Sequence, residues 1–396
     1  MISRTDALQH IAALPALEEI ERVPLQAGVG RTLASAVMAR HTHPPKDMSA
    51  MDGYAARFED CALGAKLSVI GEAPAGHPYA GSVGRGQCVR LFTGSVVPDG
   101  ADHVVIQEDV DRQDDEITIR DAQGAAPHIR AAGIDFRSGD ELIPEGTKLT
   151  ARQLSICAAG NHAELDVRRA PRIALLANGD ELRPPGTKLE PGQIIASNEY
   201  SLTALIEAWG GSVINLGIAP DDPKEIQARI EGAEQADVFV PVGGASVGDH
   251  DHMKSVFSEL GFSSIFSKVA VRPGKPTWMS QNAERLVLGL PGNPASALVC
   301  AHLFLKPLIA RLLGGTDLHT TVPASLLAPL SANGRRESFL RGRLDYSEGG
   351  ERVVMPASNQ DSSLLSPFVT SNVLIHRPID APAREVGDMV ECVLLD

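Results

Sequence analysis

The chain has 396 residues, with 50 acidic and 36 basic side chains and a formal net charge of −14. This length predicts several domains and enough buried core to fold without disulfides or structural metals. The excess of acid disfavours nucleic acid and an anionic membrane surface as partners, because both attract positive proteins. An anionic substrate would therefore need a local cluster of basic side chains and backbone N–H groups.

The five cysteines are far apart and show neither a Cys-x-x-Cys pair nor a spacing typical of a metal site. We expect buried thiols in a reducing cytoplasm. The stretch Ala7–Leu17 is broken by His10 and Pro15, so it predicts an amphipathic helix and not a signal peptide. The most apolar stretch, Ala295–Leu305, is followed by Lys306 and predicts a buried helix, too short for a membrane span.

Residues 1–43 predict two helical pieces around an extended Glu21–Leu25, and Ala151–Gly160 predicts a further helix that packs on them. We therefore expect a helical linker domain made of residues 1–43 and 137–168. Residues 44–136 are rich in glycine and proline, which predicts an inserted β-rich domain. Its β-type runs are Lys66–Ile70, Gln87–Phe92, His103–Gln107 and Glu116–Ile119.

From residue 169 to residue 318, apolar strands alternate with helices. This predicts an α/β domain with a doubly wound, mainly parallel sheet, which binds ligands at the carboxyl ends of its strands. Residues 319–396 predict a separate C-terminal β-domain. The expected strands of the sheet are Ile173–Ala177, Ser212–Gly217, Val238–Val242, Ser264–Val271 and Arg285–Leu290, and the expected helices are Ser197–Trp209, one capped by Asp222, His252–Leu260 and Ala295–Leu313.

Five loops at these strand ends predict one binding site. Two of them, residues 243–248 and 291–296, are rich in glycine and open helices, whose free N–H groups favour an anion. Lys268, Arg272 and Lys275 add the positive charge that an acidic chain needs locally. Within the glycine-rich loops, the expected substrate-binding residues are Gly243, Gly244, Ser246, Gly292 and Asn293.

Carboxylates gather at the same strand ends, at Glu181, Asp221, Asp249 and Asp251. They would repel an anion unless a cation compensates, and Mg²⁺ prefers carboxylate and phosphate oxygens. Acidic and basic groups together therefore predict a phosphorylated or nucleotidylated substrate with Mg²⁺. The alternative that the acidic residues, Asp222 among them, merely cap helices stays open.

Signatures of other enzyme classes are missing from these loops. None holds the dinucleotide-binding fingerprint, a P-loop or a Gly-x-Ser-x-Gly elbow, which disfavours nicotinamide enzymes, P-loop ATPases and α/β-hydrolases. His250 and His252 lie in acidic surroundings without a third ligand, so a zinc site is disfavoured. Ser246 has no identifiable histidine partner and is expected to donate to an anion.

Several motifs follow one another along nearly the full chain. They are Ser49–Ala55, Thr93-Gly94 with Pro98–Asp102, Gly179–Leu182, Pro191–Ile194 with Ser197-Asn198, Gly243–Asp249, Pro273–Pro276 and Leu290–Pro294. This ordered set resembles the molybdopterin molybdenumtransferase family, which comprises bacterial MoeA and the gephyrin E-domain. The resemblance implies a split linker domain, an inserted β-domain, a domain like the molybdopterin adenylyltransferases and a C-terminal β-barrel.

The resemblance also implies an activity. Family members insert molybdenum from molybdate into adenylated molybdopterin, with Mg²⁺-dependent release of AMP, in the last step of molybdenum cofactor synthesis. They are homodimers with a site between the sheet domain of one protomer and the β-domain of the other. Expected partners are the molybdopterin adenylyltransferase and molybdoenzyme apoproteins or their chaperones.

The resemblance further assigns residues by their positions in the motifs. The acidic set falls on Asp52, Asp135, Glu181, Asp221 and Asp251, of which the last three are expected to hold Mg²⁺. Lys268 joins the catalytic set. The remaining expected substrate contacts are Thr93, Arg341 and Ser362.

Among the departures from the family pattern, Arg272 stands where lysine is usual, which keeps the charge on a planar donor. Lys46 and Met48 stand where an aromatic and a polar residue are common. We expect Lys275 to hold the phosphate end of the pterin, and Lys268 and Arg272, with Ser362, to bind molybdate. Two alternatives remain: a non-catalytic molybdopterin-binding scaffold, and the related adenylyltransferase activity, which would need only the sheet domain.

Overall fold

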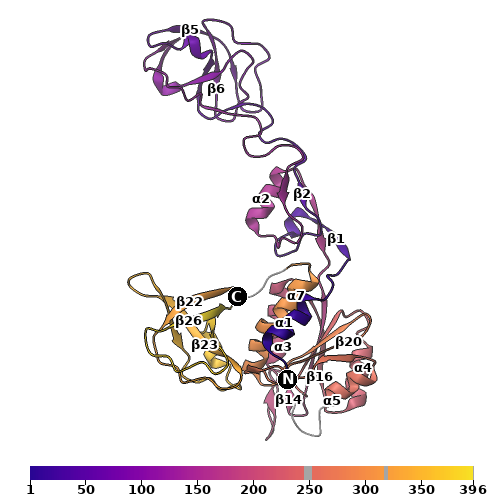
Figure 1. Cartoon of the computed structure of the whole chain (residues 1–396). Coiled ribbons are helices and arrows are strands. Elements are labelled where there is room, and N and C mark those ends of the chain that lie inside the picture. The colour runs from indigo at the N-terminus through magenta and orange to yellow at the C-terminus, as the bar shows by residue number, and fades with distance from the viewer. Residues whose placement is uncertain (245–251, 316–319, 396) are drawn as a thin grey trace.

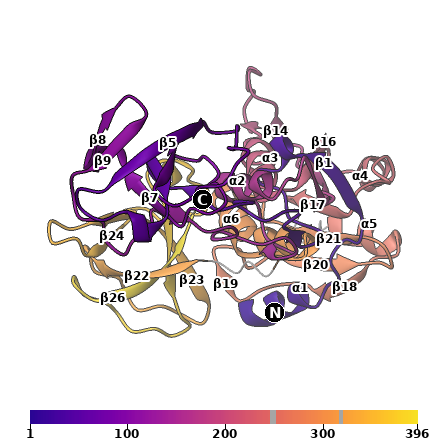
Figure 2. The same cartoon turned by 90° about the horizontal axis from the view of Figure 1, so that it is seen from above.

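The structure, a computed structural model, describes residues 1–244, 252–315 and 320–395. The molecule is elongated (Figure 1). An α/β domain and a C-terminal β-barrel lie side by side at one end, an inserted β-domain lies at the other, and a linker joins them. Figure 2 views the same chain from above, with the inserted domain nearest the viewer.

The α/β domain is built on a six-stranded sheet. Four neighbouring strands run parallel, and a pair of antiparallel strands extends one edge. The central strands are almost wholly apolar because both faces of the sheet are covered. In spatial order the strands are β16 (Ser212–Ala219), β13 (Arg172–Asn178), β17 (Val238–Val242), β21 (Leu286–Gly289), β20 (Trp278–Gln281) and β18 (Ser263–Phe266).

Helices cover both faces of this sheet, and each face has its own apolar core. One face packs against α1, α3 and the run from α6 to α7, and the other against α4 and α5. The expected doubly wound architecture is therefore confirmed. The helices are α1 (Arg4–Ala12), α3 (Asn198–Trp209), α4 (Pro223–Glu231), α5 (His252–Glu259), α6 (Pro294–Cys300), the π-helical η4 (Ala301–Leu305) and α7 (Lys306–Leu312).

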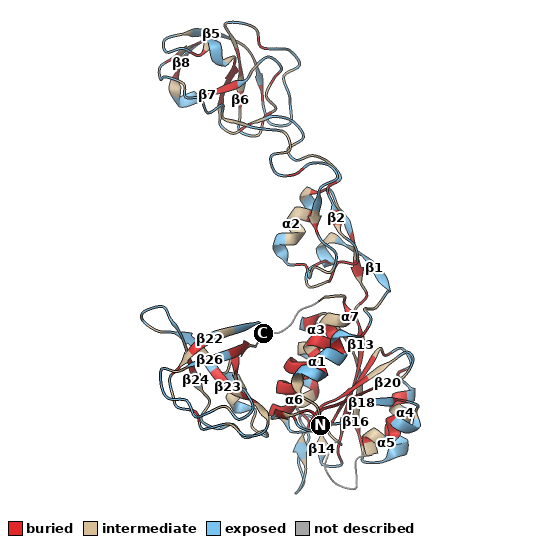
Figure 3. Cartoon of the chain, viewed as in Figure 1, coloured by how far each residue is buried: buried red, intermediate tan, exposed pale blue. Residues whose placement is uncertain are grey.

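The continuous helical run Pro294–Leu312 is long and apolar enough to cross a membrane by length and composition alone. However, 78% of its most apolar window is buried inside the protein. In Figure 3 the buried residues concentrate around this run and the sheet beside it. The segment is a core helix of the α/β domain.

The linker is formed by two passes of the chain. Two short antiparallel pairs join the passes, and one helix packs beside them over a small apolar core. The helix α1, expected in this linker, packs instead on α7 of the α/β domain. The second helical piece expected before residue 43 is only a 3-10 turn, η1 (Leu25–Ala27). The other elements of the linker are β1 (Ile20–Pro24), β12 (Glu164–Arg168), β2 (Val37–Met38), β11 (Glu141–Ile143) and α2 (Ala151–Ala159).

The inserted domain contains a six-stranded sheet with two apolar clusters. All four predicted β-type runs form strands of this sheet. A separate two-stranded pair, β3 (Met48–Ser49) with β10 (Ile129–Arg130), carries part of the first motif. In spatial order the sheet contains β7 (His103–Ile106), β4 (Gly53–Ala56), β6 (Gln87–Leu91), β5 (Lys66–Ala73), β9 (Glu116–Ile119) and β8 (Val110–Gln113).

The C-terminal domain is a closed barrel, as expected. Its five strands follow the order β23-β24-β22-β26-β25, and β25 pairs again with β23 to complete the circle. Closure removes the free sheet edges. The strands are β22 (Thr321–Leu326), β23 (Glu337–Tyr346), β24 (Arg352–Pro356), β25 (Val373–Arg377) and β26 (Met389–Leu394).

One expected strand is divided between the two neighbouring domains. The run Ser264–Val271 was predicted as a single strand of the α/β sheet, but β18 ends at Phe266. A separate strand, β19 (Val271–Arg272), pairs in parallel with the start of β23 and so belongs to the barrel sheet. The two domains are therefore joined by backbone hydrogen bonds as well as by side chains.

Candidate functional site

A large cleft of about 1410 Å³ lies between the α/β domain and the barrel. The α/β side contributes the ends of β13 and β17, the start of α6 and the loop after β19. The barrel side contributes three loops, at residues 328–333, 356–358 and 360–363. Eight of the predicted site residues line this cleft: Glu181, Gly243, Gly244, Arg272, Lys275, Gly292, Asn293 and Ser362.

The glycines of the cleft are required by close backbone approach. Gly243 and Gly244 have φ of 97° and 65°, in the left-handed region that favours glycine. A Cβ on Gly243 would lie 2.6 Å from the carbonyl oxygen of Asn178, and one on Gly292 would lie 3.2 Å from the Cα of Gly243. The prediction that both glycine-rich loops meet at one edge of the sheet is confirmed for the described residues. Ser246, Asp249 and Asp251 lie outside the described residues.

The loop after β19 brings two of the predicted cations into the cleft. Arg272 and Lys275 line it, and both side chains are exposed. Lys268 does not line it; its carbonyl oxygen accepts a hydrogen bond from the Ile2 amide at 3.0 Å. Arg272 reaches the cleft on a strand of the barrel sheet, which corrects the expectation that it follows a strand of the α/β sheet.

The acidic residues at these strand ends have different surroundings. Glu181 lines it, and the neighbouring Asp180 accepts a hydrogen bond at Oδ1 from the amide of Asp221 at 3.1 Å. Asp222 accepts from the amide of Lys224 at 2.8 Å and so caps α4, as the alternative interpretation held. Among the described residues, no three His, Cys, Asp or Glu side chains are grouped closely enough to hold a metal.

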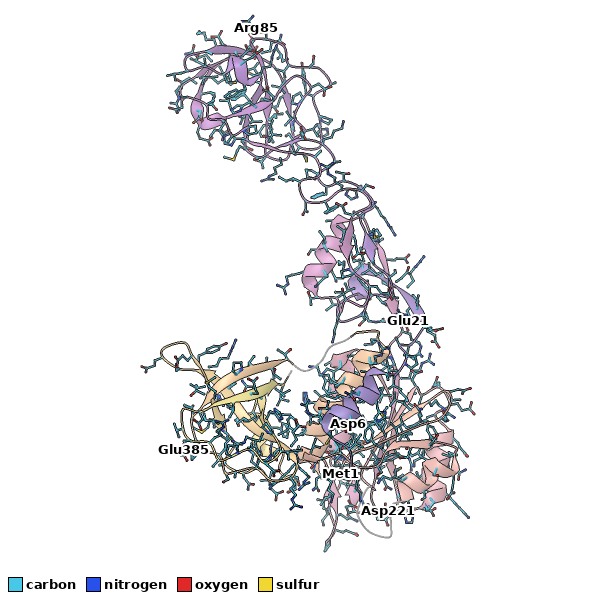
Figure 4. All side chains as sticks on the ribbon, in the orientation of Figure 1. Met1, Asp6, Glu21, Arg85, Asp221 and Glu385 are labelled. Atoms are coloured by element: carbon cyan, nitrogen blue, oxygen red, sulfur yellow. The ribbon has the colours of Figure 1, made fainter. Side chains whose placement is uncertain are left out.

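Asp221 is labelled at the lower end of the molecule in Figure 4, and Arg85 at the opposite tip of the inserted domain. The inserted domain carries two further predicted residues. Asp52 accepts two hydrogen bonds at Oδ1 from Thr93, one from the amide at 2.7 Å and one from the hydroxyl at 2.8 Å. These bonds hold the pKa of Asp52 below its usual value, the backbone bond contributing most.

Asp135 lies on the return passage from the inserted domain to the linker. Its side chain is exposed, and its amide donates to the carbonyl oxygen of His43 at 3.2 Å. Like Asp52 and Thr93, it does not line the cleft of its own chain. The inserted domain lies at the opposite end of the molecule from the α/β domain and the barrel (Figure 1). Within one chain, the structure therefore separates these three residues from the remaining predicted set.

Ser362 connects the barrel to the α/β domain. Its hydroxyl accepts a hydrogen bond from Asn293 Nδ2 at 3.0 Å, and its carbonyl oxygen accepts one from the Ala295 amide at 3.1 Å. Arg341, expected to contact substrate, is instead only 1% exposed and does not line the cleft. Its guanidinium donates to the carbonyl oxygens of Leu364 and Asp361, so it supports the loop that presents Ser362.

Some cleft residues were not found by motif. Asn178 and Asn198 have buried carbonyl oxygens without a partner, while their Nδ2 atoms donate to backbone carbonyl groups. Arg336 and Arg377 line the barrel side. Asn198 belongs to a motif of the ordered set, and Asn178 directly follows the predicted strand Ile173–Ala177 as the last residue of β13. Arg336 and Arg377 gave no signal, because only barrel closure and domain contact bring them to the cleft.

Comparison with known proteins identifies the family that has this arrangement of domains. The sequence matches the MoeA N-terminal region (domain I and II) over residues 2–160, a probable molybdopterin binding domain over 174–311 and the MoeA C-terminal region (domain IV) over 323–395. This chain belongs to the MoeA family. The resemblance inferred from the ordered motifs is therefore confirmed.

Relatives within the MoeA family match over most of their length. A Nostoc protein named molybdopterin molybdenumtransferase is 34% identical over 93% of this chain and 87% of its own. A Haemophilus influenzae protein of the same name is 35% identical over 91% and 90%. The crystal structure of a molybdopterin biosynthesis MoeA protein from Pyrococcus horikosii superimposes with a TM-score of 0.84, at 31% identity, over 100% of this chain and 99% of that one.

Proposed function

We propose that this chain is a molybdopterin molybdenumtransferase of molybdenum cofactor biosynthesis. It inserts molybdenum from molybdate into adenylated molybdopterin and releases AMP. The observation that carries the proposal is the cleft itself, which glycine backbone and Glu181 of the α/β domain line together with Arg272 of β19 and Lys275 of the loop after it. A site of this composition suits an anionic, nucleotidylated substrate in an otherwise acidic protein.

The residues of the cleft have separate tasks in this reaction. The glycine backbone at residues 243–244 and 292 admits the pterin phosphate close to the main chain, and Lys275 neutralises its charge. Arg272 binds molybdate through its planar fork, which suits an oxyanion. The hydrogen bonds from Asn293 and Ala295 to Ser362 hold the barrel against the α/β domain, so that both walls of the cleft keep their spacing.

Mg²⁺ suits the carboxylates at this edge. It needs only one or two protein carboxylates and completes its shell with water and phosphate oxygens. The described carboxylates meet that requirement, because Glu181 lines the cleft, Asp221 is exposed and Asp180 connects their loops. Bound there, the ion would neutralise charge that develops as AMP leaves. Asp251, the third expected ligand, lies outside the described residues.

A homodimer would complete the site. Asp52, Thr93 and Asp135 are exposed or half-buried on a domain that stands away from the cleft of its own chain (Figure 1). A second copy is the source that would bring these groups to the cleft. Asp52, whose pKa is lowered, would remain an acceptor at neutral pH and orient water or accept a proton.

The surroundings of the enzyme follow from the same proposal. A molybdopterin adenylyltransferase would supply the substrate, and molybdoenzyme apoproteins or their chaperones would take the product. All five cysteines are free and buried, which suits a reducing cytoplasm.

The experiment follows AMP release and reconstitution of a molybdenum apoenzyme. Purified protein is incubated with adenylated molybdopterin and Mg²⁺, with and without molybdate. We expect molybdate-dependent product from the parent, and a large loss of turnover from Glu181→Gln. Glu190→Gln is the matched control, because Glu190 is exposed on the same connection between β13 and α3 but does not line the cleft. Binding of the pterin without molybdate-dependent turnover would support the scaffold alternative instead.

A further inference from the structure

The three predicted cations of the α/β side, Lys268, Arg272 and Lys275, belong to one loop, residues 268–275. A hydrogen bond from the Val269 amide to the Lys275 carbonyl oxygen, at 3.1 Å, closes this loop. The side chains of Arg272 and Lys275 are exposed, so the backbone of the loop decides where their charges are placed. The contacts that fix this backbone therefore influence how the cleft binds an anion.

The end of the loop that carries Lys275 is fixed by the core of the α/β domain. Thr277 is fully buried, and its hydroxyl donates to the Gly274 carbonyl oxygen at 2.8 Å and lies 3.2 Å from Cys300 Sγ. The amide of Thr277 donates to the same carbonyl oxygen at 3.0 Å. Lys275 thus lies within a buried turn that leads directly into β20, and its position depends on that core.

The end of the loop that carries Arg272 is fixed differently, by the first residues of the chain and by the barrel. The amide of Ala270 donates to the Ile2 carbonyl oxygen at 2.8 Å, and its carbonyl oxygen accepts from the Glu337 amide at 3.0 Å. The Ile2 amide donates in turn to the carbonyl oxygen of Lys268 at 3.0 Å. The N-terminus lies near the boundary between the α/β domain and the barrel (Figure 1). Ala270, two residues before Arg272, is therefore where the two supports meet.

The side chain of Arg4 joins these two supports to each other. Its Nε lies 3.1 Å from both carboxylate oxygens of Glu337, and its guanidinium carbon lies 5.5 Å from the centre of the Phe339 ring. The side chains of Arg4 and Glu337 are only 22% and 15% exposed. Such a partly buried, charge-assisted pair is stronger than an ion pair on the surface. It holds the segment 2–4 against the barrel at the place where both contact Ala270.

We propose that Arg4 is a positioning residue for the reaction: through its pair with Glu337 it keeps the supports of Ala270 in place and so fixes the position of Arg272. Arg4 does not line the cleft, so it acts only through the loop. The inference rests on the proposed function for the role of Arg272 in binding molybdate. Because Thr277 fixes Lys275 independently, loss of Arg4 disturbs the binding of molybdate more than the binding of the pterin phosphate.

The test combines steady-state kinetics with hydrogen exchange, both on the full chain. Molybdate and adenylated molybdopterin are varied in turn, and exchange is followed in peptides that cover residues 268–272. Arg4→Met removes the pair with Glu337, and Arg4→Lys restores a positive charge at the same position. Arg311→Met is the matched control, because Arg311 Nε donates to the Leu14 carbonyl oxygen at 2.6 Å, just beyond the other end of α1.

We expect Arg4→Met to raise the KM for molybdate about fivefold or more, with less than about a twofold change in the KM for adenylated molybdopterin and in kcat. Amides in the peptides that cover residues 268–272 should exchange roughly tenfold faster in this variant, because the loop opens more often. Arg4→Lys should lie closer to the parent than to Arg4→Met in both measurements. Arg311→Met should match the parent in the ratio of the two KM values and in exchange.

A parental KM for molybdate in Arg4→Met, or an equal rise in both KM values, would overturn the inference, because neither result separates Arg272 from Lys275. If Arg4→Met does not fold, Glu337→Gln weakens the same pair from the barrel side and decides by the same two KM values. Hydrogen exchange needs no turnover, so a parent without molybdate-dependent product would contradict the proposed function and still leave the support of the loop measurable. Parental exchange in Arg4→Met would overturn that support while the proposed function stands.

Discussion

Asn293 of the α/β domain donates a hydrogen bond from Nδ2 to the hydroxyl oxygen of Ser362 in the barrel, at 3.0 Å. The two residues lie 69 positions apart in sequence, on opposite walls of the cleft. The bond therefore joins the two walls of the cleft directly. Through this bond, Asn293, a residue of a glycine-rich loop, also forms a contact between the two domains.

A double-mutant cycle measures this contact. Asn293→Ala and Ser362→Ala each remove one partner, and the amide of Ala295 still holds the Ser362 carbonyl oxygen in both variants. We expect a coupling of about 0.5–1.5 kcal/mol, seen as a higher KM for adenylated molybdopterin with a smaller change in kcat. Ser363→Ala is the control, because the Ser363 hydroxyl donates only to Asp361. Coupling of Asn293 to Ser363 as large as that to Ser362 would contradict the assignment.

The hydrogen bonds between Asp52 and Thr93 are expected to make the stability of the inserted domain depend on pH. Both bonds from Thr93 favour the carboxylate, so the pKa of Asp52 is below its ordinary 3.8. Because the pKa is depressed by folding, the contribution to stability is present above pH 3.8 and is lost as the pH falls through the folded pKa. We expect Thr93→Val to raise the pKa of Asp52, as followed by NMR titration of its carboxyl carbon. Thr93→Ser keeps the hydroxyl and should preserve the low value; equal values in both variants would contradict the role of the hydroxyl.

Much of the fold could be predicted from the sequence, because buried parallel strands such as β13 and β17 leave continuous apolar runs ended by glycine. The glycine-rich loops were found for the same reason, since the parallel order of those strands brings their ends together. The strand Ser264–Val271 could not be divided correctly. Phe266 and Val271 are both buried, in different sheets, and the sequence holds no glycine or proline between them.

The arginines of the barrel show where sequence reasoning ends. Arg341 was assigned to substrate, whereas the structure buries it against the carbonyl oxygens of the Ser362 loop. Arg377 carried no signal at all. A single arginine in a short strand does not reveal whether its donors meet protein or ligand, because that depends on which loops the closed barrel brings beside it.

A side chain at position 274 is expected to lower the stability of the protein strongly. Gly274 has φ of 118°, and a Cβ there would lie 2.1 Å from Cys300 Sγ. We expect Gly274→Ala to destabilise the protein by roughly 1–3 kcal/mol beyond the cost of backbone strain, measured by urea denaturation. Gly192→Ala is the control for strain alone, because Gly192 has φ of 87° and open space around it.

The clash between a Cβ at position 274 and Cys300 Sγ can also be removed by substituting Cys300. Cys300 is fully buried, and burial raises the pKa of its thiol to about 12, so it acts as packing and not as a nucleophile. Adding Cys300→Ala to Gly274→Ala should therefore recover part of the lost stability. If the double variant is less stable than the sum of the two single changes, the clash is not the cause.

The carboxylate of Glu337 in the barrel contacts Arg4 of α1, and we expect the stability that this contact contributes to depend on pH. Both carboxylate oxygens of Glu337 lie 3.1 Å from Arg4 Nε, and Oε1 lies 2.6 Å from His376 Nε2. Its amide also donates to the Ala270 carbonyl oxygen, beside the strand that carries Arg272. Burial alone would raise the pKa of Glu337, but the bonds from His376 and Arg4 outweigh it and lower the pKa from 4.5.

Because the pKa is depressed in the folded protein, the stabilisation by Glu337 is present above pH 4.5 and disappears as the pH falls through the folded pKa. Glu337→Gln should cost about 1–3 kcal/mol at neutral pH, where it removes a charge-assisted pair, and progressively less toward about pH 3. Urea denaturation across this range gives the difference between parent and variant. Glu385→Gln, an exposed change in the same barrel, should show no such trend. A difference that is constant with pH would mean that Glu337 acts through shape and not through its charge.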